Sequence, residues 1–218
     1  LFDSLLLGHP IELVVYRADQ GQLPRSTRDC DAWMIPGSRA GVYEDLEWLP
    51  GLERFTSRLL EQSRPLIGVC FGHQLIAKVL GAPVARDENG WNVGAVDYRL
   101  RTQPPGDTTD DPTFTLIASH QDQVLELPPG TTLLADAPAC PIAGFIAESV
   151  LSIQAHPEFT AELAASLYRG RVDHLGRQPV AAALATLERP LDEGRVARWI
   201  AAFLAERTGR SATSPTAE

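Results

Sequence analysis

The chain is poor in cysteine, which limits the kinds of protein it can be. Its 218 residues include three cysteines, Cys30, Cys70 and Cys140. An odd number at these spacings suits neither a disulfide framework nor a structural zinc site. We therefore expect a protein of a reducing compartment, the cytoplasm, that needs no metal and no other cofactor.

Long apolar runs and an excess of positive charge are also missing. No apolar run reaches the roughly 18 residues that span a bilayer, and no charged-then-apolar leader stands before the first predicted element. The 28 acidic residues outnumber the 19 basic ones, so the formal net charge is −9. Nucleic acids and anionic membranes attract basic patches. The sequence therefore argues against both as partners and leaves small polar substrates open.

A single cysteine between two glycines is the most informative feature that is present. Residues 66–69 form a short apolar strand pattern, and an amphipathic helix pattern follows the cysteine. A sharp turn between them strains the backbone at the residue it exposes, and Gly68 and Gly72 fit positions where a side chain would collide with its neighbours. The start of a helix also favours an anion, and so a thiolate. The pattern predicts an exposed nucleophile at Cys70.

A base for this nucleophile is offered much further along the chain. An apolar strand pattern at residues 150–155 leads into His156-Pro157-Glu158. Pro157 biases His156 toward an extended conformation, in which residues two apart project to the same side. Glu158 would then hold the imidazole ring, while the other ring nitrogen takes the proton of the thiol and returns it to a leaving amine.

Together these two motifs resemble the signature of the class I glutamine amidotransferases. The cysteine segment fits the family's Gly-x-Cys-x-Gly-x-Gln pattern, and the His-Pro-Glu motif follows in the family's order. Residues 31–38 resemble the strand and turn that supply an oxyanion donor. Residues 90–94, 119–124 and 140–141 are similar to the GMP-synthetase-like branch, here as a stand-alone form. The likeness covers roughly residues 30–159.

The resemblance implies amide hydrolysis through a covalent intermediate. Cys70 would attack the side-chain amide of glutamine, ammonia would leave, and water would hydrolyse the γ-glutamyl thioester to glutamate. The charge that develops on the carbonyl oxygen needs donors that are already in place. We assign this oxyanion hole to the backbone N–H of Phe71, which follows the nucleophile, and to that of Gly37 in the turn of residues 36–38.

The family motifs also indicate where the amino acid end of the substrate binds. We expect it to lie against Gln74 and against the segment Ser119, His120 and Gln121. Many relatives carry glycine after the histidine of that segment, whereas Gln121 brings a side chain close to the bound amino acid. The resemblance therefore fixes the substrate less firmly than the chemistry. His73 is expected to pack locally, since a helix residue so close to the cysteine points elsewhere.

Three functions remain open at this point. The first is a glutaminase-type enzyme that passes ammonia to a separate synthase subunit, since the chain has no glycine-rich phosphate loop with Lys-Ser or Lys-Thr. The second is a γ-glutamyl peptidase that uses the same three residues on a peptide or conjugate bond. The third is a catalytically silent regulatory subunit, against which the intact set of Cys70, His156 and Glu158 argues.

The resemblance implies an α/β fold of the flavodoxin-like, three-layer type, with a mostly parallel central sheet, a small antiparallel wing and extra C-terminal helices. The patterns agree, because a helix at 51–64 lies between strand patterns, which implies parallel pairing. The first three strand patterns are 11–16, 32–35 and 66–69. Those of the wing are 95–100, 113–118, 132–135 and 142–147. The C-terminal helical patterns are 161–169, 180–187 and 192–205.

The remaining expectations concern the ends and one loop. We expect a single domain over residues 1–207, without the family's central first strand, and a disordered polar tail over 208–218. Residues 103–112 are rich in proline and polar residues and are expected to form a mobile surface connection. In the last helix, Arg195 is expected to face solvent, because the apolar residues of that helix would face the core.

Overall fold

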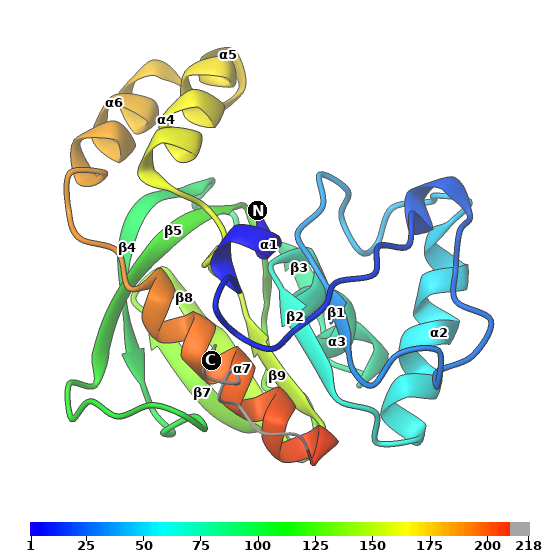
Figure 1. Ribbon diagram of the computed structural model, residues 1–218. Helices are drawn as coiled ribbons and strands as arrows, with labels where there is room; N and C mark the ends of the chain where they lie inside the picture. Colours follow the sequence, from blue (N-terminus) through cyan, green and yellow to red (C-terminus); the bar gives the residue numbers. More distant parts are fainter. Residues whose placement is uncertain (210–218) are drawn as a thin grey trace.

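The computed structural model describes residues 1–209 as a central sheet with helices on both faces (Figure 1). The strands are β1 (Trp33–Ile35), β2 (Leu66–Val69), β3 (Val84–Arg86), β4 (Asn92–Leu100), β5 (Thr113–His120), β6 (Asp122–Val124), β7 (Thr132–Ala137), β8 (Cys140–Ala147) and β9 (Val150–Ile153). The helices are α1 (Phe2–Leu5), α2 (Leu49–Glu61), α3 (Phe71–Val79), α4 (Ala161–Gly170), α5 (Val172–Leu175), α6 (Arg177–Thr186) and α7 (Glu193–Thr208), with a 3₁₀ turn, η1, at Ala18–Gln20.

The sheet is mixed. Its order is β1-β2-β9-β8-β7-β4-β5, and β3 and β6 form a separate antiparallel pair. The strands β1, β2 and β9 run parallel, whereas the other neighbouring pairs are antiparallel. The expected α/β class with an antiparallel wing is confirmed. The sheet has a smaller share of parallel strands than predicted. The connections of β7–β8 and β8–β9 are tight turns, which permit only antiparallel pairing.

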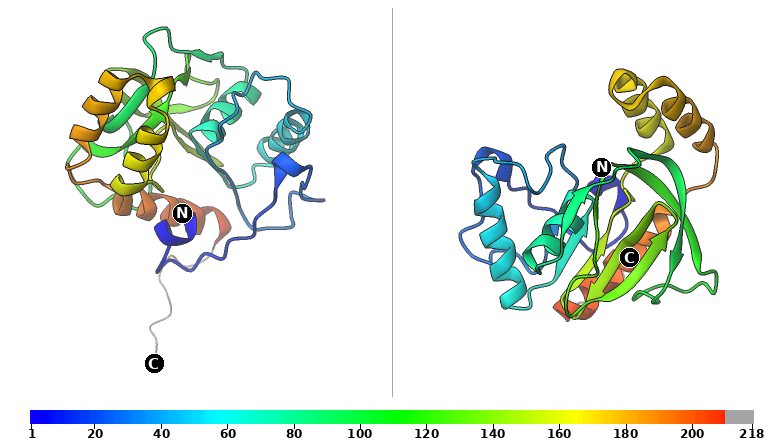
Figure 2. Two further views of the ribbon diagram at one scale, coloured as in Figure 1. Left: turned by 90° about the horizontal axis from the view of Figure 1, so that it is seen from above. Right: turned by 180° about the vertical axis from the view of Figure 1, so that it is seen from behind.

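Helices cover both faces of the sheet and create three layers. In Figures 1 and 2, α7 lies across one face and α2 and α3 lie on the other. The alternation within β2 explains this, because Leu66 packs in the cluster with α2 and α3, while Ile67 and Val69 pack in the cluster with α7. Val150 and Leu151 of β9 repeat the same division. Each of these two strands is therefore buried on both sides.

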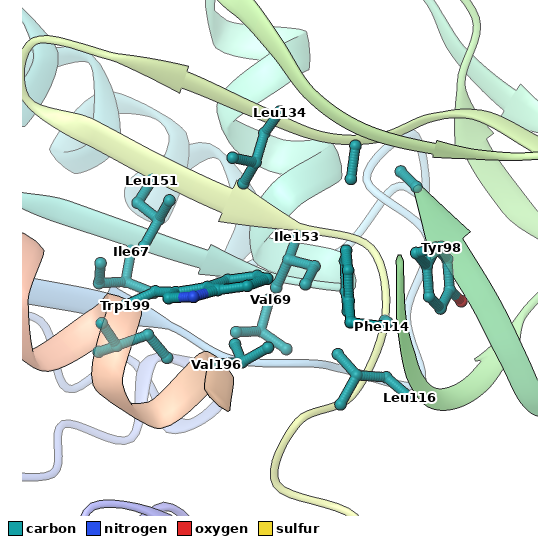
Figure 3. Close-up of a cluster of buried hydrophobic side chains, with 14 of the residues drawn as sticks. Ile67, Val69, Tyr98, Phe114, Leu116, Leu134, Leu151, Ile153, Val196 and Trp199 are labelled. Atoms are coloured by element: carbon teal, nitrogen blue, oxygen red, sulfur yellow. The ribbon is translucent and has the colours of Figure 1, made fainter. Parts of the chain in front are cut away.

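The core beneath the two predicted motifs is shown in Figure 3. Val69 of β2, Ile153 of β9 and Trp199 of α7 belong to one buried cluster. The ring of Phe114 meets Trp199 edge-on, with 5.0 Å between ring centroids. Burying a side chain of this kind stabilises a fold by about 1.5–3 kcal/mol. This cluster fixes the ends of β2 and β9, from which the cysteine and histidine motifs continue.

Residues 11–16 do not form the expected strand. Within residues 1–209, no strand pairs with this segment. Even β1, at the edge of the sheet, pairs only with β2. Val14 and Val15 are 59% and 77% exposed. A strand needs a neighbour for its backbone N–H and C=O groups. The alternation of apolar residues was therefore an insufficient sign of a strand here, and the segment runs in an irregular path beside the sheet (Figure 1).

The helices after residue 159 confirm the three helical patterns and add one short helix, α5. In Figure 1, α4, α5 and α6 form a group beyond the end of β4 and β5. Ala164 and Tyr168 of α4 share a buried cluster with Ile117 of β5. The hydroxyl of Tyr168 donates to the carbonyl of Ala118 at 2.5 Å and accepts from the N–H of Gly94 at 2.9 Å. The group is thus attached firmly to the sheet.

Residues 103–112 form an irregular surface connection, as predicted, but the loop is anchored at Asp107. The prediction that Arg195 faces solvent was wrong, because Arg195 is buried. The guanidinium of Arg195 in α7 bonds both carboxylate oxygens of Asp107, at 3.0 and 2.8 Å. It also donates to the carbonyls of Thr113 and Asp111. The Arg195 and Asp107 side chains are only 6% and 1% exposed. A buried charge needs such a partner, and the loop supplies it.

Within the described residues, no helix combines the length and the apolar character needed to cross a membrane. Helix α7 runs to Thr208, and residues 210–218 of the expected tail lie outside the described part of the chain. The single domain over residues 1–207 stays a prediction.

Candidate active site

Cys70 lies at the strained turn between β2 and α3. Its backbone has φ 51° and ψ −102°, a left-handed conformation that is unusual for a residue with a side chain. A Cβ on Gly68 would lie 2.9 Å from the backbone of Gly72, and a Cβ on Gly72 would lie 1.9 Å from the carbonyl oxygen of Ile35. The predicted reason for both glycines is therefore confirmed. Strain of this kind concentrates at functional sites.

The thiol is less open than predicted. Cys70 is only 6% exposed, because its side chain packs in the core cluster with α7 and lies beneath its neighbours in the site. Its N–H donates to the carbonyl of Ile153 at 2.9 Å, which ties the turn to β9. The nucleophile candidate is thus held between two strands rather than displayed on the surface.

His156 and Glu158 meet, although not for the predicted reason. Nδ1 of His156 lies 2.8 Å from Oε1 of Glu158, and the two side chains are 6% and 4% exposed. The motif forms a turn instead of an extended strand: the N–H of Phe159 donates to the carbonyl of His156 at 3.4 Å. Proline is well suited to the second position of such a turn, which is where Pro157 stands. The N–H of His156 is fixed by the carbonyl of Ile117 at 2.9 Å.

Burial and charge act in opposite directions on His156. Burial lowers the pKa of His156, but the charge of Cys70 and a hydrogen bond with it, followed by the contact with Glu158, raise the pKa to about 10. The thiol and the imidazole are therefore in contact across the site. At neutral pH the raised pKa keeps the His156 imidazole protonated beside the Cys70 side chain.

The two predicted oxyanion donors both border Cys70. A Cβ on Gly37 would lie 2.8 Å from Cε1 of His156 and 3.6 Å from Cβ of Cys70, so the Gly37 backbone faces both side chains. Phe71 is the first residue of α3. Its N–H is one of the terminal groups that have no acceptor within their helix. The role of both backbone groups as oxyanion donors stays a prediction.

Gln74 is oriented by two bonds from its amide nitrogen. Nε2 donates to the carbonyl of Asp122 at 2.8 Å and to Oε1 of Gln154 at 3.0 Å. Both amide hydrogens are used, so Oε1 remains as the acceptor of this side chain. Gln154 is fully buried, so its hold on Gln74 is shielded from water.

His120 is a buried neighbour of these groups. Its Nδ1 lies 3.1 Å from the carbonyl of Asp122. Burial lowers the pKa of His120 to about 4, so the ring is neutral at pH 7. Nε2 is buried and, among the described residues, has no hydrogen-bond partner. This atom is therefore ready to bond a ligand.

Ser119 and Gln121 flank this histidine. Ser119 pairs with Val93 in the β4–β5 ladder. The carbonyl of Gln121 accepts from the N–H of Asp87 at 2.8 Å, and its side-chain amide lies 3.5 Å from the carbonyl of Asp87. Gln121 is thus tied to the segment between β3 and β4. Its predicted contact with a bound amino acid stays a prediction.

His73 packs locally, as predicted. Its ring lies 2.8 Å from the hydroxyl of Ser152 and 3.1 Å from the carbonyl of Ile142, and it is fully buried. Burial lowers the pKa of His73 to about 3. The ring is neutral and points away from the thiol side of α3.

Two residues of the site were missed by sequence reasoning. Gln154 interrupts the apolar run before the His-Pro-Glu motif, and this polar residue in a buried strand pattern was a usable signal. The ring of Phe159 stacks on that of His156 with 4.1 Å between centroids and 16° between planes. No pattern in the sequence indicated that contact. Within the described chain, no group of three or more potential ligands is arranged to hold a metal ion.

Comparisons with known proteins identify the family of the chain. The family model "Glutamine amidotransferase class-I" matches residues 4–170. Gamma-glutamyl peptidase 3 of Arabidopsis thaliana is 32% identical over 158 residues, which cover 68% of this chain and 64% of that protein. The glutamine-hydrolyzing GMP synthase of Bordetella parapertussis is 33% identical over 136 residues, or 58% of this chain and 25% of the synthase. The chain thus spans less than two thirds of either relative.

A solved structure supports the same assignment at the level of the fold. The crystal structure of a glutamine amidotransferase from Methylobacillus flagellatus superposes with a TM-score of 0.74 at 23% identity, covering 100% of this chain and 92% of that one. At this identity the likeness concerns the fold alone. The family model spans well over half of the sequence. The chain belongs to the class I glutamine amidotransferase family.

Proposed function

We propose that the protein hydrolyses the γ-amide of glutamine or of a related γ-glutamyl compound, with Cys70 as nucleophile, His156 as base and Glu158 as the group that orients the base. One observation carries this proposal. A cysteine at a strained helix N-terminus contacts an imidazole whose other nitrogen lies 2.8 Å from a buried carboxylate. Membership of an amidotransferase family supports it.

The first half of the reaction forms a thioester. The Cys70 thiolate attacks the γ-carbonyl carbon, and the carbonyl oxygen takes up the negative charge. The N–H groups of Phe71 and Gly37 bond this oxygen, and each donor is worth about 3 kcal/mol in comparable enzymes. The C–N bond then breaks, and the His156 imidazolium gives its proton to the departing nitrogen. Ammonia or an amine leaves, and the γ-glutamyl group stays on sulfur.

The second half hydrolyses the thioester. Neutral His156 takes a proton from water as the oxygen attacks the thioester carbon, and the same two N–H groups hold the oxyanion. The C–S bond breaks and glutamate leaves. The thiolate and the imidazolium are restored. Glu158 accepts the Nδ1 proton of His156 in a hydrogen bond and keeps it in place throughout.

The amino acid end of the substrate is assigned to the polar groups beside the thiol. Glutamine and γ-glutamyl compounds carry an α-ammonium, which has three donors and no acceptor. The free acceptor Oε1 of Gln74 is matched to this ammonium. We assign the α-carboxylate to the segment Ser119, His120 and Gln121. Because Nδ1–H of the neutral His120 donates to the carbonyl of Asp122, its unpartnered Nε2 is an acceptor and serves a donor of the substrate instead. These two assignments favour a substrate whose α-amino group is free.

A γ-glutamyl peptidase activity is the second candidate. Its specific support is the 32% identity to the Arabidopsis gamma-glutamyl peptidase. The engagement of the Gln121 side chain with Asp87 also supports it, because that side chain is turned toward the β3–β4 segment. The departing amine would then be a peptide or conjugate instead of ammonia, and the Cys70 chemistry would be unchanged.

A partner is implied only for the glutaminase version. The similarity to a GMP synthase supports a separate synthase subunit that would receive the ammonia. A silent regulatory role is disfavoured, because Cys70, His156 and Glu158 are all present and in contact. We keep the cytoplasm as the proposed location, since three cysteines at these spacings suit no disulfide framework and favour a reducing compartment.

The test is release of glutamate by the purified protein. Free glutamine and a γ-glutamyl dipeptide are compared for the wild type, for Cys70→Ala and for Cys30→Ala as a cysteine control outside the site. We expect Cys70→Ala to lose activity on either substrate by about a thousandfold or more, and Cys30→Ala to retain it. Faster dipeptide cleavage would identify a peptidase. Wild-type rates in Cys70→Ala would refute the proposed function.

A further inference from the structure

Phe159 makes a flat contact with the ring of His156. The two centroids are 4.1 Å apart and the planes differ by 16°. The contact is created by the turn in which the N–H of Phe159 bonds the carbonyl of His156, because residues i and i+3 of a turn lie close together. The nucleophile and Glu158 make no comparable contact with a face of this ring.

A face contact restricts a motion that the Glu158 hydrogen bond leaves free. That bond holds one atom, Nδ1, so the imidazole can still rock about the Nδ1···Oε1 direction. A rocking ring moves Nε2 away from the sulfur of Cys70. Phe159 limits this motion from one face, while the backbone of Gly37 approaches the ring at Cε1. Phe159 and the backbone of Gly37 therefore restrict the movement of the imidazole from two directions.

Phe159 is itself anchored in a different part of the molecule. It packs against the buried cluster formed by α4, α6 and β5, whose members include Ala164, Tyr168 and Ile117. Tyr168 bonds the sheet at Ala118 and Gly94. Phe159 thus connects the position of the His156 ring to the helical group after the motif.

From this geometry we propose that Phe159 is a positioning residue for His156, which it holds in the plane that aims Nε2 at Cys70. The inference rests on the proposed function. It adds a role to α4, α5 and α6, because a ring can hold another only if it is fixed itself. Phe159 touches neither the substrate nor the reacting atoms in this assignment and acts through the imidazole alone.

The same contact favours the charged ring. The face of a phenyl group attracts a cation, and His156 carries a proton when paired with a thiolate. The charged or titratable groups that face it are Cys70 from the β2–α3 turn, Glu158 from its own turn and the neutral His120 from β5. Loss of the phenyl ring removes one stabilising partner of the imidazolium and leaves those three in place.

The test compares three variants. Phe159→Leu keeps an apolar side chain but removes the flat face, Phe159→Tyr keeps the face, and Leu184→Ala perturbs the same buried cluster from α6. We expect Phe159→Leu to lower kcat about tenfold or more with KM changed less than about twofold, as for a misplaced catalytic group. It also shifts the basic limb of the kcat/KM profile down by about 0.5 pH unit. Phe159→Tyr retains the wild-type values of both, and Leu184→Ala, which loosens the cluster around Phe159 but keeps its ring, changes both in the same direction by less than Phe159→Leu does.

A second readout separates this inference from the proposed function. The pKa of His156 is measured by NMR titration of its ring protons, which needs no substrate. We expect Phe159→Leu to lower that pKa and to remove the upfield ring-current shift, and Phe159→Tyr to retain both. If the wild type cleaves no γ-glutamyl compound, the proposed function fails while this titration still tests the contact. An unchanged titration and profile in Phe159→Leu, or equal losses in Phe159→Tyr, would overturn the inference.

Discussion

His73 in α3 and Ser152 in β9 form a fully buried contact, with 2.8 Å between Nδ1 and Oγ. The contact joins the helix that follows the nucleophile to the strand that precedes the base. His73 also bonds the carbonyl of Ile142 in β8 at 3.1 Å. These bonds of His73 therefore fix α3, which follows Cys70, relative to β9, which precedes His156. They act in addition to the contacts within the site.

This buried histidine predicts that acid destabilises the protein. In the unfolded chain His73 takes up a proton as pH falls through about 6.5, whereas in the fold burial lowers its pKa to about 3. Between these values the unfolded state binds more protons, so stability is present above pH 6.5 and is lost as pH falls. We expect the free energy of unfolding to drop by about 1.4 kcal/mol per pH unit from this residue. Urea unfolding at a series of pH values measures the slope.

The contribution of His73 is isolated by His73→Asn. Asparagine can bond Ser152 but does not titrate. The pH dependence of the free energy of unfolding should therefore be smaller in the variant, by about 1.4 kcal/mol per pH unit. A slope equal to that of the wild type would show that His73 takes up its proton while the protein is folded.

Gly72→Ala is predicted to destabilise the protein, although alanine normally stabilises a helix. Gly72 lies in α3, where the change to alanine would ordinarily add about 0.5–1 kcal/mol. Here the new Cβ would stand 1.9 Å from the carbonyl oxygen of Ile35. The backbone of α3 or β1 has to move, at a cost of at least about 2 kcal/mol. Thermal or urea unfolding shows directly whether Gly72→Ala raises or lowers the free energy of unfolding.

Gly170→Ala is the matched control for that substitution. Gly170 is the last residue of α4, and a Cβ there would meet no atom within 4 Å. This variant should be as stable as the wild type or more so. Equal effects at both glycines would show that the contact between α3 and β1 does not limit residue size.

Cys70 is predicted to be the most reactive thiol of the chain. Its side chain lies beside the protonated imidazole of His156, which can stabilise negative charge that develops on the sulfur, whereas burial raises the pKa of Cys140 to about 12 and leaves that thiol protonated. A glutamine-like electrophile should therefore alkylate Cys70 first, and excess glutamine should slow the reaction. Peptide mass analysis after short exposure identifies the modified residue.

The dependence on the imidazole is tested with His156→Ala in the same assay. The variant should react with the electrophile more slowly near neutral pH, and the difference should shrink at high pH, where any thiol ionises. Preferential alkylation of Cys140, or uniformly slow thiols in the wild type, would contradict the assigned pair.

Breaking the buried ion pair of Arg195 and Asp107 is predicted to be costly. Arg195→Met leaves the Asp107 carboxylate buried without its partner, which typically costs about 3–5 kcal/mol. The control is Arg189→Met, because Arg189 pairs with Asp97 at the surface, where such pairs contribute about 0–1 kcal/mol. Urea unfolding of the two variants gives the comparison. A loss in Arg195→Met no larger than in the control would mean that Asp107 finds water or another partner.

The local parts of the site could be predicted from the sequence. The glycines around Cys70 are needed by steric contacts within one turn, and such contacts leave a local pattern. The meeting of His156 and Glu158 was also predicted. His156 forms a β-bridge with Ile117, but the extended segment does not continue, since the chain turns at Pro157 and Glu158. A spacing of two residues brings side chains together in either geometry, so the pattern alone did not distinguish them.

The non-local parts could not be predicted in the same way. Arg195 and Asp107 are 88 residues apart, and a charged residue on a helix gives no sign of the loop that will cover it. Residues 11–16 have the alternation of a strand, but pairing depends on a neighbour elsewhere in the chain. The stack of Phe159 on His156 depends on the turn, and the turn was not foreseen.

The register of the parallel strands has a consequence for how the protein is made. Val69 of β2 lies opposite Ile153 of β9, although some 80 residues separate them in the chain. All of β3 to β8 is synthesised between the cysteine and its histidine. A growing chain on the ribosome thus carries Cys70 without His156 beside it until β9 has docked, and pairing over such long separations is slow. The two side chains therefore come together late, when most of the sheet has already been synthesised.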